Sequence, residues 1–183
     1  FNEVYFSDLR VKDSQRLGEV GDGWKVALVT LMNERLAVGG SSGPDYKTIM
    51  DLARQVTGPG GAAIKDGAFR EKLADWYVAA EGLKLTRFRT MTALSRGQTP
   101  GPESSILKIK GTEIQQRLQE LALEAVGHYG APFLRDLQGN NLGIGPDYAD
   151  GLAGEMFNGR KTSIYGGSNE IQRNIIAKMV LGL

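Results

Sequence analysis

The sequence contains no cysteine, and this absence excludes disulfide bridges, thiolate catalysis and cysteine-based metal sites. A single histidine among 183 residues argues against a histidine-based metal site. No run of 18 apolar residues occurs, so we expect no transmembrane helix. The 22 basic and 21 acidic residues give a formal net charge of +1, which provides no electrostatic reason to expect binding to nucleic acid or to an acidic membrane.

The residues that are present predict a helical protein. Apolar residues make up 41% of the chain, as is typical of a globular domain, and their spacing predicts five or six helices. Helices are expected over residues 23–40, 44–56, 67–96, 102–126 and 147–157, with a turn and a last helix within 164–183. The third is the longest and spaces its apolar residues by three or four, which is typical of an antiparallel, up-down bundle. A strand is expected only over residues 1–10, where apolar residues partly alternate.

The first predicted helix, with the sequence GWKVALVTLMNERLAVGG over residues 23–40, is apolar on almost every side. Such a helix is expected to be buried. Glu34 and Arg35 lie near its end, and a carboxylate on a buried helix is costly unless it is paired or used. Two interpretations follow. Glu34 and Arg35 form structural ion pairs between helices, or Glu34 is a desolvated carboxylate with a raised pKa that acts as a general base.

The tail of the chain, IYGGSNEIQRNIIAKMVLGL, combines a glycine turn with a helix start. Gly166 and Gly167 allow the backbone to approach a ligand or a neighbouring segment closely. Ser168 or Gly167 caps the helix that follows, and the first turn of that helix exposes N–H groups that suit an anion. Arg160 and Arg173 are expected to pair with a carboxylate or a carbonyl and to have no chemical role.

Three stretches together resemble the acyl-CoA dehydrogenase family: FNEVYFSDLRV with LGEVGDGW, then LMNER, then the tail described above. The resemblance implies that residues 1–20 are the end of the family's middle β domain and a connector. Residues 21–183 would form the C-terminal four-helix-bundle domain with a short closing helix. Family members are about twice this length, so the N-terminal helical domain and most of the β domain would lie outside these residues.

The same resemblance implies a chemistry. Flavin adenine dinucleotide (FAD) takes a hydride from the β-carbon of an acyl-CoA thioester, while a carboxylate base removes the α-proton and a trans-2-enoyl-CoA is formed. The electrons leave to an electron-transfer flavoprotein or a similar acceptor. The resemblance further implies a homotetramer or homodimer built through the bundle, in the cytoplasm or, in a eukaryote, in the mitochondrial matrix.

The resemblance offers two alternative positions for the catalytic base. In most of the family the base is a glutamate directly before the glycine of the tail turn, whereas here Tyr165 precedes Gly166. In isovaleryl- and long-chain-type members the base is instead the acid of a Glu-Arg pair on the first bundle helix, which Glu34 and Arg35 match. The resemblance thus implies that Glu34 is catalytic and that Arg35, Tyr165 and Gly166 bind substrate. For Arg35 a plain salt bridge is an equal alternative.

Flavin contacts are implied at two places. Arg54 matches the arginine that family members lend across a subunit interface to the flavin pyrophosphate, although Thr57 replaces the aromatic residue expected after it. The family's Gln…Gly-Gly-x-Gly loop corresponds to Glu124, Gly127 and Gly130. Glu124 departs from the family's glutamine, and a carboxylate beside a pyrophosphate would repel it.

Further flavin contacts are implied at Ser168 and Glu170, which match the tail positions that reach the adenosine side of the flavin. Capping alone is the alternative for Ser168. His128 replaces a glycine of the family's loop, and a surface role is expected for it. The altered loop motivates one alternative function, a non-catalytic partner subunit in a mixed oligomer. A second alternative is a helical assembly domain without an active site of its own, because most of the β domain would lie outside these residues.

Overall fold

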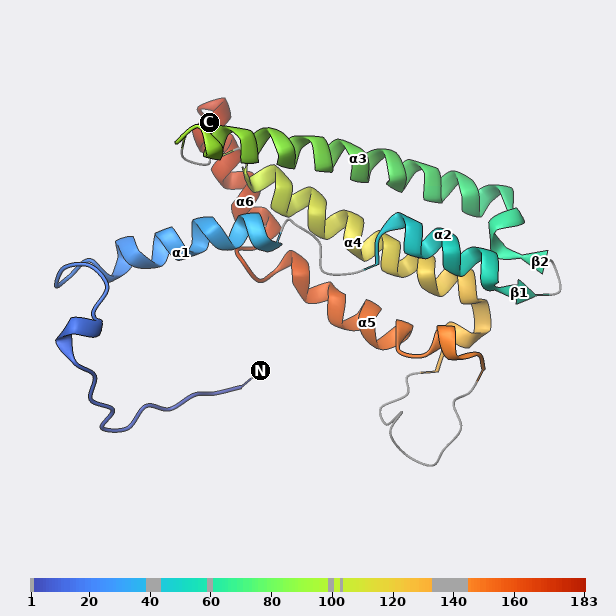
Figure 1. Cartoon of the computed structure of the whole chain (residues 1–183), viewed down its shortest axis with the longest axis horizontal. Helices are drawn as coiled ribbons and strands as arrows, with labels where there is room; N and C mark the ends of the chain where they lie inside the picture. The colour runs from blue at the N-terminus through green and yellow to red at the C-terminus, as the bar shows by residue number, and fades with distance from the viewer. Residues whose placement is uncertain (1, 39–43, 59–60, 99–100, 103, 133–144) are drawn as a thin grey trace.

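The computed structural model describes residues 2–38, 44–58, 61–98, 101–102, 104–132 and 145–183, except for the side chains of 32–33 and 35–38. Within these residues the fold is all-α, as predicted. The helices are α1 (Gly23–Val38), α2 (Tyr46–Gln55), α3 (Gly67–Ser95), α4 (Ser104–Val126), α5 (Leu152–Gly159) and α6 (Asn169–Ile176) (Figure 1). Short 3-10 turns lie at Asp13–Gln15, Ala63–Lys65, Gly127–Gly130, Asp147–Ala149 and Arg160–Ser163, and a π turn at Ala177–Leu181 follows α6.

Helix α4 is the centre of the bundle. It packs against α1, α2, α3, α5 and α6, which surround it on several sides (Figure 1). The hydrophobic core lies where α2, α3 and α4 meet, and its buried members are Ile49, Ala53, Phe69, Leu73, Ile114, Leu118, Leu121, Ala122 and Ala125. Each large apolar side chain buried in such a core contributes about 1.5–3 kcal/mol of transfer free energy. The bundle therefore depends on the residues of α4 more than on those of any other helix.

Two aspartates fix where helices begin. Asp45 accepts a hydrogen bond from the N–H of Thr48 at 2.8 Å at the start of α2, and Asp66 accepts one from the N–H of Phe69 at 2.9 Å at the start of α3. A side-chain oxygen at this position satisfies a backbone donor that the helix itself leaves unpaired. The predicted third helix, 67–96, is confirmed almost residue for residue, because this cap and Gly97 bound a continuous apolar stripe.

The strand predicted over residues 1–10 is wrong for the part of it that the structure describes. Residues 2–10 form no strand, and Val4, Tyr5 and Phe6 are 73%, 80% and 76% exposed. A strand needs a partner that accepts its backbone hydrogen bonds, and no described segment pairs with this one. The sheet in the described residues is a small antiparallel hairpin of β1 (Thr57–Gly58) and β2 (Gly61–Ala62), which the sequence did not predict.

The predicted burial of the first helix is also wrong. In α1, Trp24 is 71% exposed, Val29 is 60% exposed and Leu28 is 39% exposed, and none of the described side chains of this helix is fully buried. The helix reaches outward from one end of the bundle and has its main contact with α4 (Figure 1). An apolar helix that touches one neighbour can cover only one of its faces, which leaves the other faces exposed.

Candidate functional site

Glu34 lies in the part of α1 that approaches the bundle. Its side chain is half-buried, and it forms no ion pair with the described residues. The interhelical ion pair expected as one interpretation of Glu34 is therefore not present among them, although the side chain of Arg35 lies outside the described residues. Because α1 is less buried than predicted, the desolvation expected at Glu34 is incomplete in this chain.

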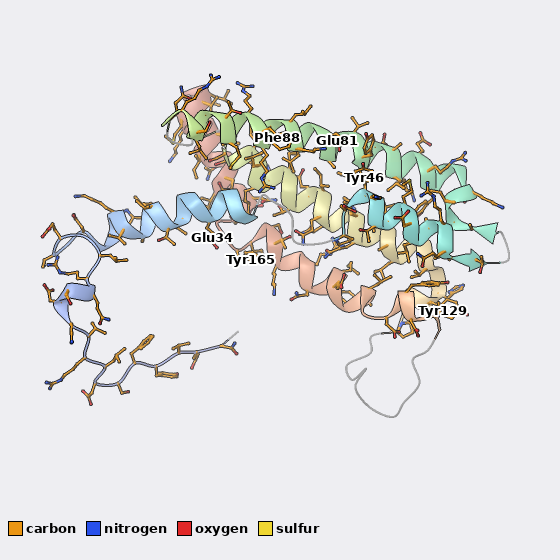
Figure 2. The ribbon with its side chains drawn as sticks, viewed as in Figure 1. Glu34, Tyr46, Glu81, Phe88, Tyr129 and Tyr165 are labelled. Atoms are coloured by element: carbon orange, nitrogen blue, oxygen red, sulfur yellow. The ribbon has the colours of Figure 1, made fainter. Side chains whose placement is uncertain are left out.

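The glycine turn before α6 is held in a conformation that requires glycine. Gly166 and Gly167 have φ angles of +68° and +85°, in the left-handed region that disfavours side chains. Gln172 lies directly beneath this turn: its Nε2 donates to the carbonyl of Gly166 at 3.4 Å, and a Cβ on Gly167 would come within 2.5 Å of the same nitrogen. The neighbouring Tyr165 is 39% exposed. Figure 2 shows Glu34 and Tyr165 near the same end of the bundle and Tyr129 at the other.

Ser168 and Glu170 form the start of α6. Ser168 accepts a hydrogen bond from the N–H of Ile171 at 3.4 Å, so the predicted capping role is confirmed. Glu170 is exposed, and hydrogen bonds from its own backbone N–H and from the Ser168 hydroxyl lower its pKa below the ordinary value. The positive charges of Arg173 and Lys108 act in the same direction. This helix start therefore stabilises negative charge, as its N–H groups lead one to expect.

The remaining predicted flavin residues lie elsewhere. Arg54, in the last turn of α2, pairs with Asp51 at 3.0 Å, and Glu124, near the end of α4, pairs with Lys72 at 2.7 Å. All four of these side chains are at least 44% exposed. Gly127 has a φ of +57° where α4 gives way to the following 3-10 turn, so the bend there requires glycine.

The predicted site residues thus form two clusters at opposite ends of α4. The turn cluster contains Glu34, Tyr165, Gly166, Ser168 and Glu170. The loop cluster contains Arg54, Glu124, Gly127 and Gly130. Contacts of α6 reach α4 from Lys108 to Glu113, which lie sixteen and eleven residues before Glu124, or about 16–24 Å along the helix. The structure does not bring all the predicted flavin residues together within one chain.

A cavity of about 480 Å³ adjoins the turn cluster. It lies between α2, α4 and α5, and its lining includes Thr48, Gln119, Thr162 and Tyr165. Gln119 is 6% exposed, and its Oε1 has no hydrogen-bond partner in the described part of the structure. Gln119 was not predicted as a site residue, although it lies beside the buried Leu118 and Ala122 of α4.

Two arginines expected to be structural are paired with carboxylates of α4. Arg173 Nη2 lies 3.1 Å from Glu113 Oε1, and Arg160 Nη2 lies 2.6 Å from Glu120 Oε1. Desolvation raises the pKa of Glu120, but the hydrogen bonds and the positive charges of Arg117 and Arg160 together outweigh it, so that the net pKa is lowered. The expectation that each of these arginines pairs with a carboxylate is confirmed, and both pairs connect the end of the chain to α4. In the described residues no group of acidic or histidine side chains is arranged to hold a metal ion.

Comparison with known proteins identifies the family. Residues 21–181 match the family "Acyl-CoA dehydrogenase, C-terminal domain". The chain belongs to the acyl-CoA dehydrogenase family. It is 33% identical over 189 residues to the acyl-CoA dehydrogenase IpdE1 of Mycobacterium tuberculosis, covering 100% of this chain and 44% of that protein. It is 28% identical over 196 residues to the acyl-CoA dehydrogenase FadE26 of the same organism, covering 98% of this chain and 45% of that protein.

Solved structures of acyl-CoA dehydrogenases share the fold. Butyryl-CoA dehydrogenase from Megasphaera elsdenii superposes with a TM-score of 0.76 at 22% identity, over 96% of this chain and 43% of that one. An acyl-CoA dehydrogenase from Geobacillus kaustophilus gives a TM-score of 0.76 at 23% identity, over 98% and 44%. The chain therefore spans less than half the length of the acyl-CoA dehydrogenases it matches. Among the described residues, no helix is both long and apolar enough to cross a membrane.

Proposed function

We propose that this chain supplies the C-terminal part of an FAD-dependent acyl-CoA dehydrogenase, with Glu34 as the general base. The observation that supports this best is the position of Glu34. It is half-buried on α1, a helix that packs on α4, and α4 also carries α6 and the glycine turn. A base on the first bundle helix and a turn with accessible backbone are the two parts that a thioester needs nearby.

The proposed reaction uses these residues in distinct roles. Bound FAD would supply the acceptor for the hydride that leaves the β-carbon of the acyl group. Glu34 takes the proton from the α-carbon, so that the electron pair of that C–H bond forms the new double bond. The backbone N–H of Gly166 suits the thioester carbonyl, whose oxygen gains negative charge as the proton leaves, whereas the N–H of Tyr165 already donates to the carbonyl of Lys161 at 3.1 Å. Arg35 would orient Glu34 or the substrate, and the electrons would pass from the flavin to an electron-transfer flavoprotein or a similar acceptor.

The residues of the two clusters suit FAD. At the turn cluster, the start of α6 favours negative charge, which suits a phosphate-bearing cofactor. At the loop cluster, Lys72 Nζ lies 2.7 Å from Glu124 Oε1, so the positive charge of the lysine offsets the negative charge of the glutamate. This reduces the repulsion expected between the carboxylate and a pyrophosphate. The guanidinium of Arg54 is 56% exposed, and a surface pair with Asp51 is weak enough to be exchanged for a phosphate.

The separation of the clusters supports an oligomer. The contacts of α6 on α4 lie about 16–24 Å along the helix from Glu124, so the two clusters form separate sites within one chain. We infer that the turn cluster of one subunit and the loop cluster of a neighbour would contact the same flavin, as the family resemblance of Arg54 implies. A homodimer or homotetramer formed through the bundle would satisfy this geometry.

The base assignment is tested by Glu34→Gln in the full-length protein that contains these residues. Amide for carboxylate removes the proton acceptor and preserves shape, so we expect the rate of flavin reduction by acyl-CoA to fall about 10²–10⁴-fold. Flavin content, measured by absorbance, should be unchanged. The control is Glu71→Gln, which alters an exposed glutamate on α3 and should leave the rate unaltered. Flavin reduction within a few-fold of the unmodified rate would show that Glu34 is not the base and would favour a non-catalytic subunit.

A further inference from the structure

A buried lysine lies behind the glycine turn, and the proposed reaction does not use it. Lys108 of α4 is 0% exposed and is the largest fully buried side chain of the described residues. Its Nζ donates to Oδ1 of Asn169 at 2.9 Å, and no carboxylate lies within ion-pair distance of it among the described residues. Burying an ammonium group without a carboxylate partner is costly, because the charge loses its hydration. Burial accordingly lowers the pKa of Lys108, although the charge of Glu170 opposes this effect.

The hydrogen bonds of Asn169 connect this lysine to the start of α6. Asn169 is the first residue of α6 and is 7% exposed. Besides accepting from Lys108, it donates through Nδ2 to the hydroxyl of Thr112 at 3.4 Å. Thr112 is itself fully buried one turn further along α4. Two side chains of α4 therefore hold both ends of one amide, which fixes the first residue of α6 in position and orientation.

The start of α6 in turn fixes the glycine turn. Gln172, also 0% exposed, contacts the carbonyl of Gly166 from below and leaves no room for a side chain at Gly167. Since Gln172 lies one helical turn after Asn169, a shift of the α6 start would move the support of the turn with it. The connection therefore runs from Lys108 to Asn169, then along the first turn of α6, and from Gln172 to the backbone of Gly166.

Helix stability alone does not account for a lysine at this place. A positive charge beside a helix N-terminus faces the positive end of the helix dipole, and this unfavourable term adds to the cost of burial. Glu170 offsets part of it, since its carboxylate lies in the same first turn. An apolar side chain of similar length would fill the space without either cost. What the ammonium group adds is a directional bond to Asn169.

We propose that Lys108 is a positioning residue for the glycine turn: its bond to Asn169 holds the start of α6, and through Gln172 it holds the backbone of Gly166 in place for the substrate. The placement of the turn stands on the contacts above, while its use by a thioester rests on the proposed function. Neither Lys108 nor Asn169 is expected to touch substrate.

Hydrogen–deuterium exchange and kinetics of the full-length protein test this proposal. Lys108→Met removes the ammonium group and preserves the volume, so backbone amides of residues 165–171 should exchange about tenfold faster, while those of α3 stay unchanged. With an acyl-CoA substrate, kcat should fall about tenfold and KM should change less than threefold, because the orientation of the thioester is altered rather than the grip on CoA. Lys84→Met, at an exposed lysine of α3, is the matched control and should change neither quantity.

A second variant keeps the test decisive if Lys108→Met unfolds the protein. Asn169→Asp has nearly the same shape and gives Lys108 a carboxylate partner, so exchange of residues 165–171 should become at least threefold slower. Where Lys108→Met folds, Asn169→Asp in its background leaves a buried carboxylate unpaired, and exchange should become faster instead. The proposal is overturned if exchange of the turn is unchanged in Lys108→Met, or if Asn169→Asp in the presence of Lys108 leaves that exchange unchanged or makes it faster. Because exchange is measured without substrate, this result is independent of the outcome at Glu34.

Discussion

Helices α1 and α4 are both rich in apolar residues, yet they differ in how far their side chains are buried. Most residues of α4 are buried, including Leu107, Ile114 and Leu118 at 1%, 6% and 3% exposure. In α1, Trp24 and Val29 are 71% and 60% exposed. The difference follows from the number of neighbours, since α4 has helices on several sides and α1 has one main contact (Figure 1). Apolar character makes a helix suitable for burial, but whether the helix is buried depends on the segments that pack around it.

The comparison also separates the two kinds of charged residue that apolar helices carry. On α4, the buried Lys108 is bonded to a polar side chain of another helix at 2.9 Å. On α1, Glu34 is half-buried and forms no ion pair with the described residues. A charged group that is fully buried in the core needs a hydrogen-bonding partner nearby, whereas a charged group on a partly covered helix can stay unpaired and remain free to react. This availability is what the proposed base requires.

The largest expected difference between the two helices concerns stability. Leu118→Ala on α4 creates a cavity in the core and should lower the free energy of unfolding by about 2–5 kcal/mol. Val29→Ala on α1 removes methyl groups that are already largely in water and should change it by less than about 0.5 kcal/mol. Urea unfolding of both variants measures this. Equal losses of stability in the two variants would mean that α1 is buried in solution and does not differ from α4 in burial.

Glycines extend the comparison to close contact and open surface. Gly167 has a φ of +85° above the buried Gln172, so Gly167→Ala should lower the free energy of unfolding by about 1–3 kcal/mol. Gly82 lies inside α3 with nothing near its missing Cβ, so Gly82→Ala should raise it by about 0.5–1 kcal/mol through better helix propensity. Thermal unfolding of the two variants should give opposite signs. A stabilising Gly167→Ala would show that the turn is not held in the left-handed conformation.

Local features of the sequence predicted local features of the structure. The bounds of α3 followed from a stripe of apolar residues that ends at Gly97, and the capping role of Ser168 followed from its place after two glycines. Such features depend on a few neighbouring residues and on the backbone hydrogen bonds they complete. The glycine turn and its helix start, which carry most of the turn cluster, were therefore predictable.

Features that depend on distant contacts were not. The predictions of a strand over residues 1–10 and of burial for α1 were both wrong. A hydrophobic pattern indicates which face of an element is apolar, but not which other segment covers that face. The separation of Arg54 and Glu124 from the turn cluster follows from how α6 docks at the beginning of α4, which no short motif encodes. Lys108 was missed because lysine is ordinarily a surface residue, although its position beside Leu107 and Gly111 on the buried face of α4 could have shown it.

The smallest expected effect lies at the exposed end of α2, a helix that packs on α4 through Ile49 and Ala53. The backbone N–H of Thr48 and then its hydroxyl, each 2.8 Å away, hold the pKa of Asp45 below its ordinary value. A carboxyl whose pKa is depressed on folding stabilises the protein above its unfolded-state pKa, and this contribution is lost as the pH falls through the folded-state pKa. Asp45→Ala should therefore cost about 1 kcal/mol at pH 7, and the difference from the unmodified protein should shrink below about pH 4.

Urea unfolding at pH 7, 5 and 3 measures this difference, with Asp75→Ala as the control, since Asp75 is an exposed aspartate inside α3 that caps no helix. The control should stay within about 0.5 kcal/mol at each pH. Because the cap acts at the surface while Ile49 and Ala53 are held by α4, even complete loss of the cap should leave α2 folded. A loss of stability in Asp45→Ala as large as that in Leu118→Ala would mean that α2 depends on its own first turn more than on α4. Contact with α4 would then not be what separates a firmly held helix such as α2 from an exposed helix such as α1.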